Sequence, residues 1–179
     1  MSETLADGLA RLRGFLDEWG HAVAVIGGVA VIARCGTRPT EDIDLVAAAS
    51  SADIDRLLEL AAKHGFSFDE DARELASMGL VRFYVDEKRG FGLDVLFADN
   101  PYYEELVRRA TSVSIGAVTI AVATAEDLLL LKLEADRPLD IEDILTIKDA
   151  LGPSLDMGYL RSQADRLHLR AKLDLYFSS

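Results

Sequence analysis

Apolar residues along the chain alternate between helical and strand-like spacing, and this pattern predicts most of the secondary structure. Over the first twenty residues the spacing is helical, which predicts an amphipathic helix that ends at Gly20. The apolar run at residues 22–26 predicts a buried strand. Gly27 and Gly28 then turn the chain into a short helix over residues 29–34.

A second strand is predicted at residues 42–47, where apolar and acidic side chains alternate at its start. Ser50 or Ser51 can cap a helix over residues 52–64. Gly65 is the expected stop of that helix.

The spacing then changes to that of strands, and two hairpin-like pairs are predicted: residues 80–85 with 91–97, and residues 111–115 with 118–122. The connection at residues 86–90 has the length and the glycine of a hairpin turn. Between the two pairs, Asn100 and Pro101 open a short helix that runs to Arg109.

The last third of the chain is predicted to be helical, in stretches at residues 128–135, 138–151 and 155–176. The segment Thr124-Ala-Glu-Asp127 has the form of a capping box for the first of them. An α+β core at residues 1–123 thus leads into a helical part at residues 124–179. A length of 179 residues suits one well-buried domain. We therefore expect a single compact unit of the α+β class, with a mixed β-sheet flanked by helices and a helical C-terminal tail packed on it.

The charge of the chain limits its partners. A formal net charge of -12 argues against general affinity for nucleic acid, because such binding needs Lys and Arg to displace counterions from phosphates. Positive residues gather only locally, near the C-terminus: Arg161, Arg166, Arg170 and Lys172. This basic patch can face phosphate groups, or it can be a solvated helix face whose basic end suits the helix dipole.

The apolar runs are broken by glycines and are too short to span a bilayer as a helix, so no membrane segment is expected. The first residues contain an early acid and no basic start, unlike a secretory signal. Cys35 is the only cysteine, so no internal disulfide can form, and a cytoplasmic location is expected.

Two aspartates one residue apart, Asp42 and Asp44, form the most informative polar pattern. Alternate side chains of a strand share a face, so both carboxylates point the same way. A neighbouring strand can bring a third acid, Asp94, beside them. Carboxylates are the ligands that Mg²⁺ prefers, and the pattern therefore indicates metal-dependent phosphoryl or nucleotidyl transfer. An Asp-x-Asp pair alone is also common on surface strands and turns.

The glycine pair and the loop after it suit a phosphate ligand. Glycines let the backbone approach a ligand, and the unpaired N–H groups of a helix start can bind a triphosphate at Gly27 and Gly28. Taken alone, the pair is most simply a turn. Arg38 and Thr40 flank the acidic strand and can touch phosphate, although a pairing of Arg38 with Glu41 explains that arginine equally well.

This ordered set resembles the nucleotidyltransferase superfamily with the DNA polymerase β-like palm. That superfamily combines a glycine-containing helix start with Asp-x-Asp and a later strand acid, here Gly27, Gly28, Asp42, Asp44 and Asp94. The tail narrows the resemblance to the AbiEii-type nucleotidyltransferases, the toxins of type IV toxin–antitoxin systems. Their lysine, followed by an arginine and Asp-x-x-Asp, is matched here by Lys132, Arg137, Asp140 and Asp143, while a position that is usually basic in the family is Leu139.

The resemblance implies that an acceptor hydroxyl attacks the α-phosphate of a nucleoside triphosphate and that pyrophosphate leaves. Asp42 and Asp44 would hold the metal, expected as two Mg²⁺ ions, and Asp94 would complete the site and help to deprotonate the nucleophile. Lys132 would neutralise triphosphate charge, and Asp143 would support the nucleotide site. Alternatively, Lys132 snorkels from an apolar helix, and Asp143, like the other acid of the tail motif, only stabilises a helix start.

Three functions follow. The first is an AbiEii-like toxin that modifies tRNA, with contact through the basic patch and with a cognate antitoxin protein as partner. The second keeps the chemistry but has a small-molecule acceptor, as in antibiotic-modifying nucleotidyltransferases, and the acidic composition favours it. The third is a catalytically silent module that binds a nucleotide or a partner protein.

Overall fold

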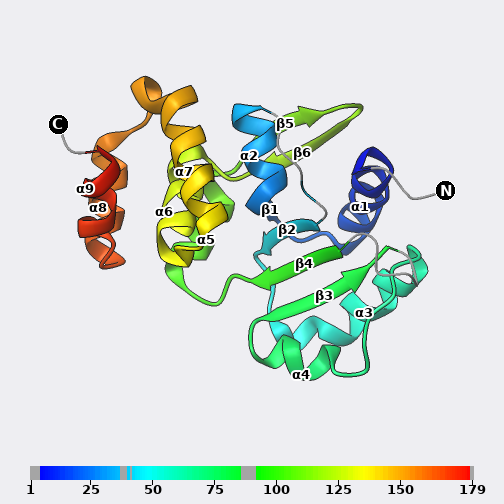
Figure 1. Ribbon diagram of the computed structural model, residues 1–179. Helices are drawn as coiled ribbons and strands as arrows, with labels where there is room; N and C mark the ends of the chain where they lie inside the picture. Colours follow the sequence, from blue (N-terminus) through cyan, green and yellow to red (C-terminus); the bar gives the residue numbers. More distant parts are fainter. Residues whose placement is uncertain (1–4, 37–39, 41, 86–91, 178–179) are drawn as a thin grey trace.

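The computed structural model describes residues 5–36, 40, 42–85 and 92–177, and these residues contain one six-stranded sheet with the order β3-β4-β2-β1-β6-β5 (Figure 1). Its strands are β1 (Val23–Ile26), β2 (Asp42–Ala47), β3 (Leu80–Tyr84), β4 (Gly92–Phe97), β5 (Thr111–Ile115) and β6 (Val118–Val122). The β1–β6 and β2–β4 pairs are parallel, and the other pairs are antiparallel. The predicted mixed sheet is therefore confirmed, while the expected turn at residues 86–90 lies outside the described residues.

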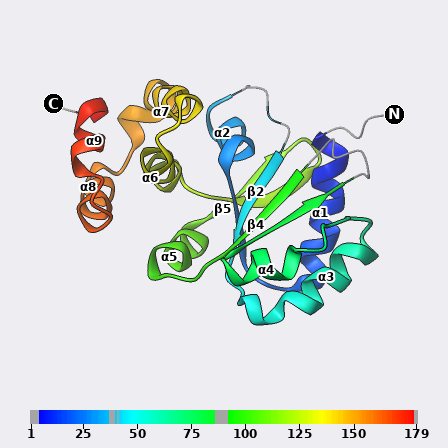
Figure 2. The same ribbon diagram turned by 60° about the horizontal axis from the view of Figure 1, so that its bottom comes forward.

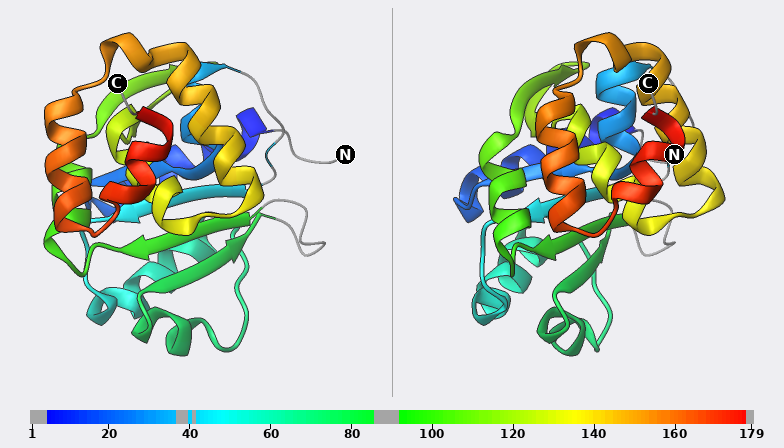
Figure 3. Two further views of the ribbon diagram at one scale, coloured as in Figure 1. Left: turned by 60° about the vertical axis from the view of Figure 1, so that its left-hand side comes forward. Right: turned by 90° about the vertical axis from the view of Figure 1, so that its left-hand side faces the viewer.

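Helices cover both faces of the sheet. Figure 2 shows α1, α3 and α4 on one face and α2 and α5 on the other, where α6 to α9 also gather (Figure 3). Their bounds are α1 (Leu5–Trp19), α2 (Gly27–Cys35), α3 (Ile54–Lys63), α4 (Ala72–Ser77), α5 (Pro101–Arg109), α6 (Ala125–Ala135), α7 (Pro138–Leu151), α8 (Met157–Arg166) and α9 (Arg170–Phe177). Among the described helices, none is long and apolar enough to cross a lipid bilayer.

The main core lies between α1, α3 and the sheet. Leu9, Leu12 and Phe15 of α1 are fully buried, as the helical spacing predicts. The Phe15 ring lies 5.5 Å from the ring of Phe66 and 6.3 Å from that of Phe83 in β3. Apolar burial on this face therefore holds the sheet in place, while the acids Asp42 and Asp44 of β2 and Asp94 of β4 lie on the opposite face.

Local signals explain most helix ends, but the structure corrects several boundaries. Asn100 caps α5 by accepting hydrogen bonds from the backbone N–H groups of its first turn. The helix α2 begins at Gly27, two residues before the predicted start, so the glycine pair is its first turn. The predicted helical stretch at 155–176 is divided near His168, whose φ is 58°. The six-residue helix α4 was not predicted, because so short a helix has too few turns to show a periodic pattern.

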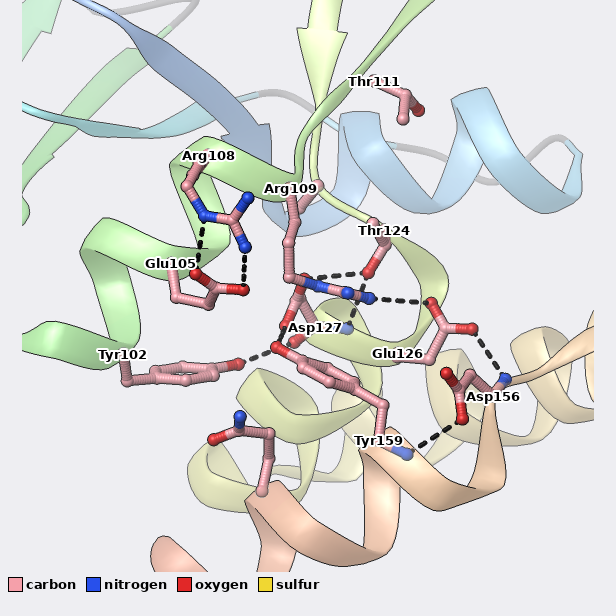
Figure 4. A network of polar contacts seen from close by, with 12 residues as sticks. Tyr102, Glu105, Arg108, Arg109, Thr111, Thr124, Glu126, Asp127, Asp156 and Tyr159 are labelled. Atoms are coloured by element: carbon pink, nitrogen blue, oxygen red, sulfur yellow. Dashed lines mark hydrogen bonds and ion pairs between the residues drawn. The ribbon is translucent and has the colours of Figure 1, made fainter.

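A buried polar cluster connects the C-terminal helices with the rest of the molecule (Figure 4). The carboxylate of Asp127 in α6 is fully buried and accepts hydrogen bonds from the hydroxyl of Tyr159 at 2.6 Å, from Arg109 Nε at 3.2 Å and from Thr124 Oγ1 at 2.8 Å. The Arg109 guanidinium lies 3.7 Å from the centre of the Tyr159 ring. Because these residues come from α5, α6 and α8, the cluster fixes α8 against the helices before it.

Candidate active site

The register of the sheet brings the predicted acids together at one end of the inner strands β2 and β4. Asp44 in β2 is paired with Ile26 at the end of β1 and with Asp94 in β4. The helix α2 starts directly after Ile26. A helix start therefore lies beside the acids, as the sequence pattern predicts.

A cavity of about 900 Å³ opens at this end of the inner strands. Its walls include Gly27, Gly28, Thr40, Asp42, Asp44, Arg82, Asp94, Lys132, Arg137 and Asp140. Most of the predicted site residues thus line one space, although they come from four separate segments of the chain. Asp143 lies behind the wall and contacts Lys132. Arg38 lies outside the described residues.

The alternation of β2 sorts its side chains between the core and the cavity. Ile43 and Leu45 are buried in the core, while Asp42 and Asp44 line the cavity. The carboxylate of Asp42 also accepts a hydrogen bond of 3.0 Å from the backbone N–H of Gly92. The predicted acidic face of the strand is therefore present.

Asp44 is the most strongly perturbed of these acids. Burial raises its pKa to about 6, and the negative charges of Asp94 and Asp42 add to this effect. Burial also raises the pKa of Asp94, against the opposing hydrogen bonds from Arg82. Two neighbouring carboxylates that both resist ionisation form a site where a cation is favourable.

Two glycines, Gly27 and Gly92, leave space for the carboxylates of Asp44 and Asp42 because they have no side chain. A Cβ on Gly27 would lie 1.9 Å from Asp44 Oδ2, and the φ of Gly27 is +65°. A Cβ on Gly92 would lie 2.3 Å from Asp42 Oδ1. Gly27 is among the predicted site residues and Gly92 is not, because the closeness of Gly92 to Asp42 follows only from the strand register.

Arg82 in β3 is a further residue of the cavity that was not predicted from the sequence. Its Nε lies 2.7 Å from Asp94 Oδ1, and its Nη2 lies 2.9 Å from Asp94 Oδ2 and 3.3 Å from Asp42 Oδ2. Arg82 stands opposite Asp94 in the β3–β4 hairpin. This pairing is the signal that could have found it, because directly opposed residues of two strands share a face.

Lys132 is buried with the two acids of the tail motif. Its Nζ lies 2.8 Å from Asp140 Oδ1 and 2.7 Å from Asp143 Oδ2, and its side chain is only 7% exposed. The snorkelling interpretation of Lys132 is therefore wrong. Asp140 also accepts a hydrogen bond of 2.6 Å from Arg137 Nε. Burial opposes ionisation of Asp140, but the hydrogen bonds from Arg137 and Lys132 lower its pKa to about 2.

The donor set fits a divalent cation in its chemistry. All of the acids that line the cavity offer oxygen atoms, and the raised pKa of Asp44 shows that positive charge is favourable beside it. Over the described parts of the chain, however, no three His, Cys, Asp or Glu side chains are arranged as a formed metal site. Arg82 lies among these carboxylates and forms ion pairs with Asp94 and Asp42.

Two residues of the basic patch near the C-terminus, Arg170 and Lys172, form ion pairs with aspartates. Arg170 lies 2.9 Å from Asp165 and 3.2 Å from Asp174, and Lys172 lies 2.7 Å from Asp136. These ion pairs reduce the positive potential of the patch and favour its interpretation as a solvated helix face.

Comparison with known proteins adds the following findings. A family described as nucleotidyl transferases of unknown function (DUF2204) matches residues 5–176. No curated protein matches the chain.

Solved structures show the same fold. The structure of ANT(2'')-Ia in complex with adenylyl-2''-tobramycin has a TM-score of 0.62 at 16% identity and covers 93% of this chain and 99% of that chain. Lincomycin-bound LnuA, a lincosamide antibiotic adenylyltransferase, has a TM-score of 0.58 at 14% identity, with coverages of 82% and 98%. An antigenic nucleotidyltransferase-like protein from Paracoccidioides brasiliensis has a TM-score of 0.59 at 20% identity, with coverages of 94% and 89%. The predicted nucleotidyltransferase-like fold is therefore confirmed.

Proposed function

The chain belongs to the DUF2204 family of nucleotidyl transferases, and from this we propose that it transfers a nucleoside monophosphate from a nucleoside triphosphate to the hydroxyl group of an acceptor. One observation carries the proposal. The start of α2, the three acids and Lys132 line the same cavity. This arrangement supports binding of a triphosphate beside divalent cations.

The start of α2 is our proposed phosphate site. Among the described residues no side chain caps this helix, and its first two residues line the cavity. The free N–H groups of a helix start bind anions through hydrogen bonds and the helix dipole. Thr40, which lines the cavity before β2, and the neighbouring Arg38 remain candidates for further phosphate contacts.

The acids have proposed roles in the transfer itself. Asp42, Asp44 and Asp94 would hold one or two Mg²⁺ ions, which when bound neutralise phosphate charge and lower the pKa of the attacking hydroxyl. Asp94 is our candidate to accept the proton of the acceptor hydroxyl. In the same step the hydroxyl oxygen bonds to the α-phosphorus, and the bond between the α-phosphorus and pyrophosphate breaks. Lys132 Nζ donates a hydrogen bond to Asp140 and forms an ion pair with Asp143, and we assign a further N–H donor of the same group to the triphosphate.

The rest of the cavity favours a small acceptor. Its further walls are mostly apolar and include Leu96, Tyr103, Leu131 and Leu139, together with one acid, Glu134, and one base, Arg137. Such a surface suits a small molecule better than the phosphate backbone of a nucleic acid. The net charge of -12 also disfavours a nucleic-acid acceptor. Of the similar proteins, LnuA is a lincosamide antibiotic adenylyltransferase, and ANT(2'')-Ia is an antibiotic-resistance factor whose structure contains adenylyl-2''-tobramycin.

An AbiEii-like toxin that acts on tRNA, with an antitoxin as partner, is the second candidate. The buried contacts of Lys132 with the two acids of the tail motif favour it, because the resemblance rests on those residues.

The test uses α-labelled nucleoside triphosphates, Mg²⁺ and two sets of acceptors, total tRNA and a panel of hydroxyl-bearing small molecules. Label in a small molecule with wild type, but not with Asp42→Asn/Asp44→Asn, supports our first choice. Label in RNA moves the assignment to the toxin. Triphosphate binding without transfer to either set of acceptors supports the silent module instead.

A further inference from the structure

Arg82 contacts two of the three acids that we propose as metal ligands, Asp94 and Asp42. The guanidinium binds both oxygens of Asp94, at 2.7 and 2.9 Å, and reaches Asp42 at 3.3 Å. A two-point contact between arginine and a carboxylate is strong and fixes the orientation of both groups. Asp94 is thus held in a geometry set by Arg82.

The same oxygens are needed for the proposed function. A divalent cation shared by Asp94 and Asp42 would take lone pairs that now accept hydrogen bonds from Arg82. A guanidinium and a divalent cation close to each other also repel. Arg82 and the cation therefore compete for these two acids.

The position of Arg82 allows its guanidinium to move away from Asp94 and Asp42. Its side chain is 41% exposed and lines the cavity, so the released guanidinium would stay inside the space that Gly27 and Gly28 also line. A triphosphate bound there would give it new acceptors. Arginine binds phosphate through the same planar group of donors that it uses for carboxylates.

We propose that Arg82 is an internal counter-cation that occupies the acid cluster before a divalent cation binds and then exchanges Asp94 and Asp42 for a phosphate of the nucleotide. Arg82 is thus a positioning residue that couples cation binding to triphosphate binding. The inference rests on the proposed function of this cavity.

The test measures Mn²⁺ affinity by electron paramagnetic resonance, without turnover, for wild type and Arg82→Met, with and without inorganic tripolyphosphate. Without tripolyphosphate, we expect Arg82→Met to bind Mn²⁺ about tenfold more tightly, because the competing charge is gone. Tripolyphosphate should raise the Mn²⁺ affinity of both proteins. The increase should be at least about threefold larger in wild type than in the variant, because the variant lacks the guanidinium that would bind the phosphate.

Arg73→Met is the matched control, because Arg73 forms a 2.8 Å pair with Asp55 on the surface and its loss changes the net charge equally. We expect less than about a twofold change in Mn²⁺ affinity for this control. Arg82→Lys keeps the charge and serves if Arg82→Met does not fold. Its Mn²⁺ affinity should exceed that of wild type, because lysine cannot make the two-point contact.

The outcomes separate this inference from the proposed function. Weaker or unchanged Mn²⁺ binding in the folded Arg82 variants, with binding still abolished by Asp44→Asn, overturns the role of Arg82 alone. No Mn²⁺ binding in wild type or in any Arg82 variant overturns the metal site of the proposed function and this inference with it.

Discussion

Lys132 Nζ lies 2.8 Å from Asp140 Oδ1, in a contact between α6 and α7 that is almost fully excluded from water. Asp143 approaches the same ammonium group at 2.7 Å. A buried charge is tolerated only when it is paired, so these residues depend on one another. The wall of the cavity is therefore sensitive to the loss of either charge.

Replacement of Lys132 should destabilise the protein as well as impair transfer. Lys132→Met leaves two acids buried without their ammonium partner, and we expect the free energy of unfolding to fall by about 3–5 kcal/mol. Urea denaturation measures this change. Lys172→Met is the control, because its pair with Asp136 is solvent-exposed and should be worth less than about 1 kcal/mol. Equal effects of the two changes would contradict the burial argument.

Asp44 should lower stability at neutral pH. Its pKa is about 6 in the folded protein against 3.8 for an ordinary aspartate, so the folded state binds the proton more tightly than the unfolded state. The contribution of Asp44 to stability must therefore fall as the pH rises from about 4 to 6 and stay low above that.

Asp44→Asn should accordingly be more stable than wild type at pH 7, by about 2 kcal/mol, with little difference at pH 3.5. Urea denaturation at the two pH values without added metal measures this difference. Mg²⁺ should stabilise wild type more than Asp44→Asn at pH 7. A variant that is less stable than wild type at pH 7 would show that the acids are not under electrostatic stress.

Gly27→Ala should be worse than a glycine replacement that has only backbone strain. The new Cβ would lie 1.9 Å from Asp44 Oδ2, and the left-handed backbone adds about 1–2 kcal/mol. Gly116→Ala is the matched control, because Gly116 has a φ of +60° and its added Cβ would meet no described residue within 4 Å other than its chain neighbours. We expect Gly27→Ala to cost about 1–3 kcal/mol more than this control in urea denaturation.

A second replacement tests the source of that cost. Asp44→Ala removes the carboxylate that the new Cβ would strike, so Gly27→Ala should be less destabilising in the Asp44→Ala background than in wild type. Simple additivity of the two changes would mean that Gly27 and Asp44 are not in steric contact.

The two tyrosines around Asp127 should differ in their contributions to stability. Tyr159 donates its hydroxyl to the buried carboxylate at 2.6 Å, whereas Tyr102 donates to the backbone carbonyl of the same residue at 3.2 Å. We expect Tyr159→Phe to cost about 1.5–3 kcal/mol and Tyr102→Phe about 0.5–1.5 kcal/mol, because a hydrogen bond to a charged group is stronger. Thermal unfolding of the two variants would contradict this ranking if Tyr102→Phe melted at the lower temperature.

The local elements of the fold could be predicted because their signals are local. The alternation at the start of β2 placed Asp42 and Asp44 on one face, and Asn100 marked the start of α5. The start of α2 was predicted two residues too late, because a glycine pair usually signals a turn and here forms the first turn of a helix. The Arg38 prediction lies outside the described residues, and the catalytic roles of the acids remain predictions.

The sequence by itself determined the local elements and identified most of the predicted site residues that line the cavity, since strand alternation and helix capping depend only on near neighbours. Only the tertiary structure decided which charges meet. Arg82 binds Asp94 through the register of β3 and β4, and Lys132 loses its contact with water because α7 packs on α6. Electrostatic partners and burial depend on residues that are distant in the sequence, and no local pattern contains that information.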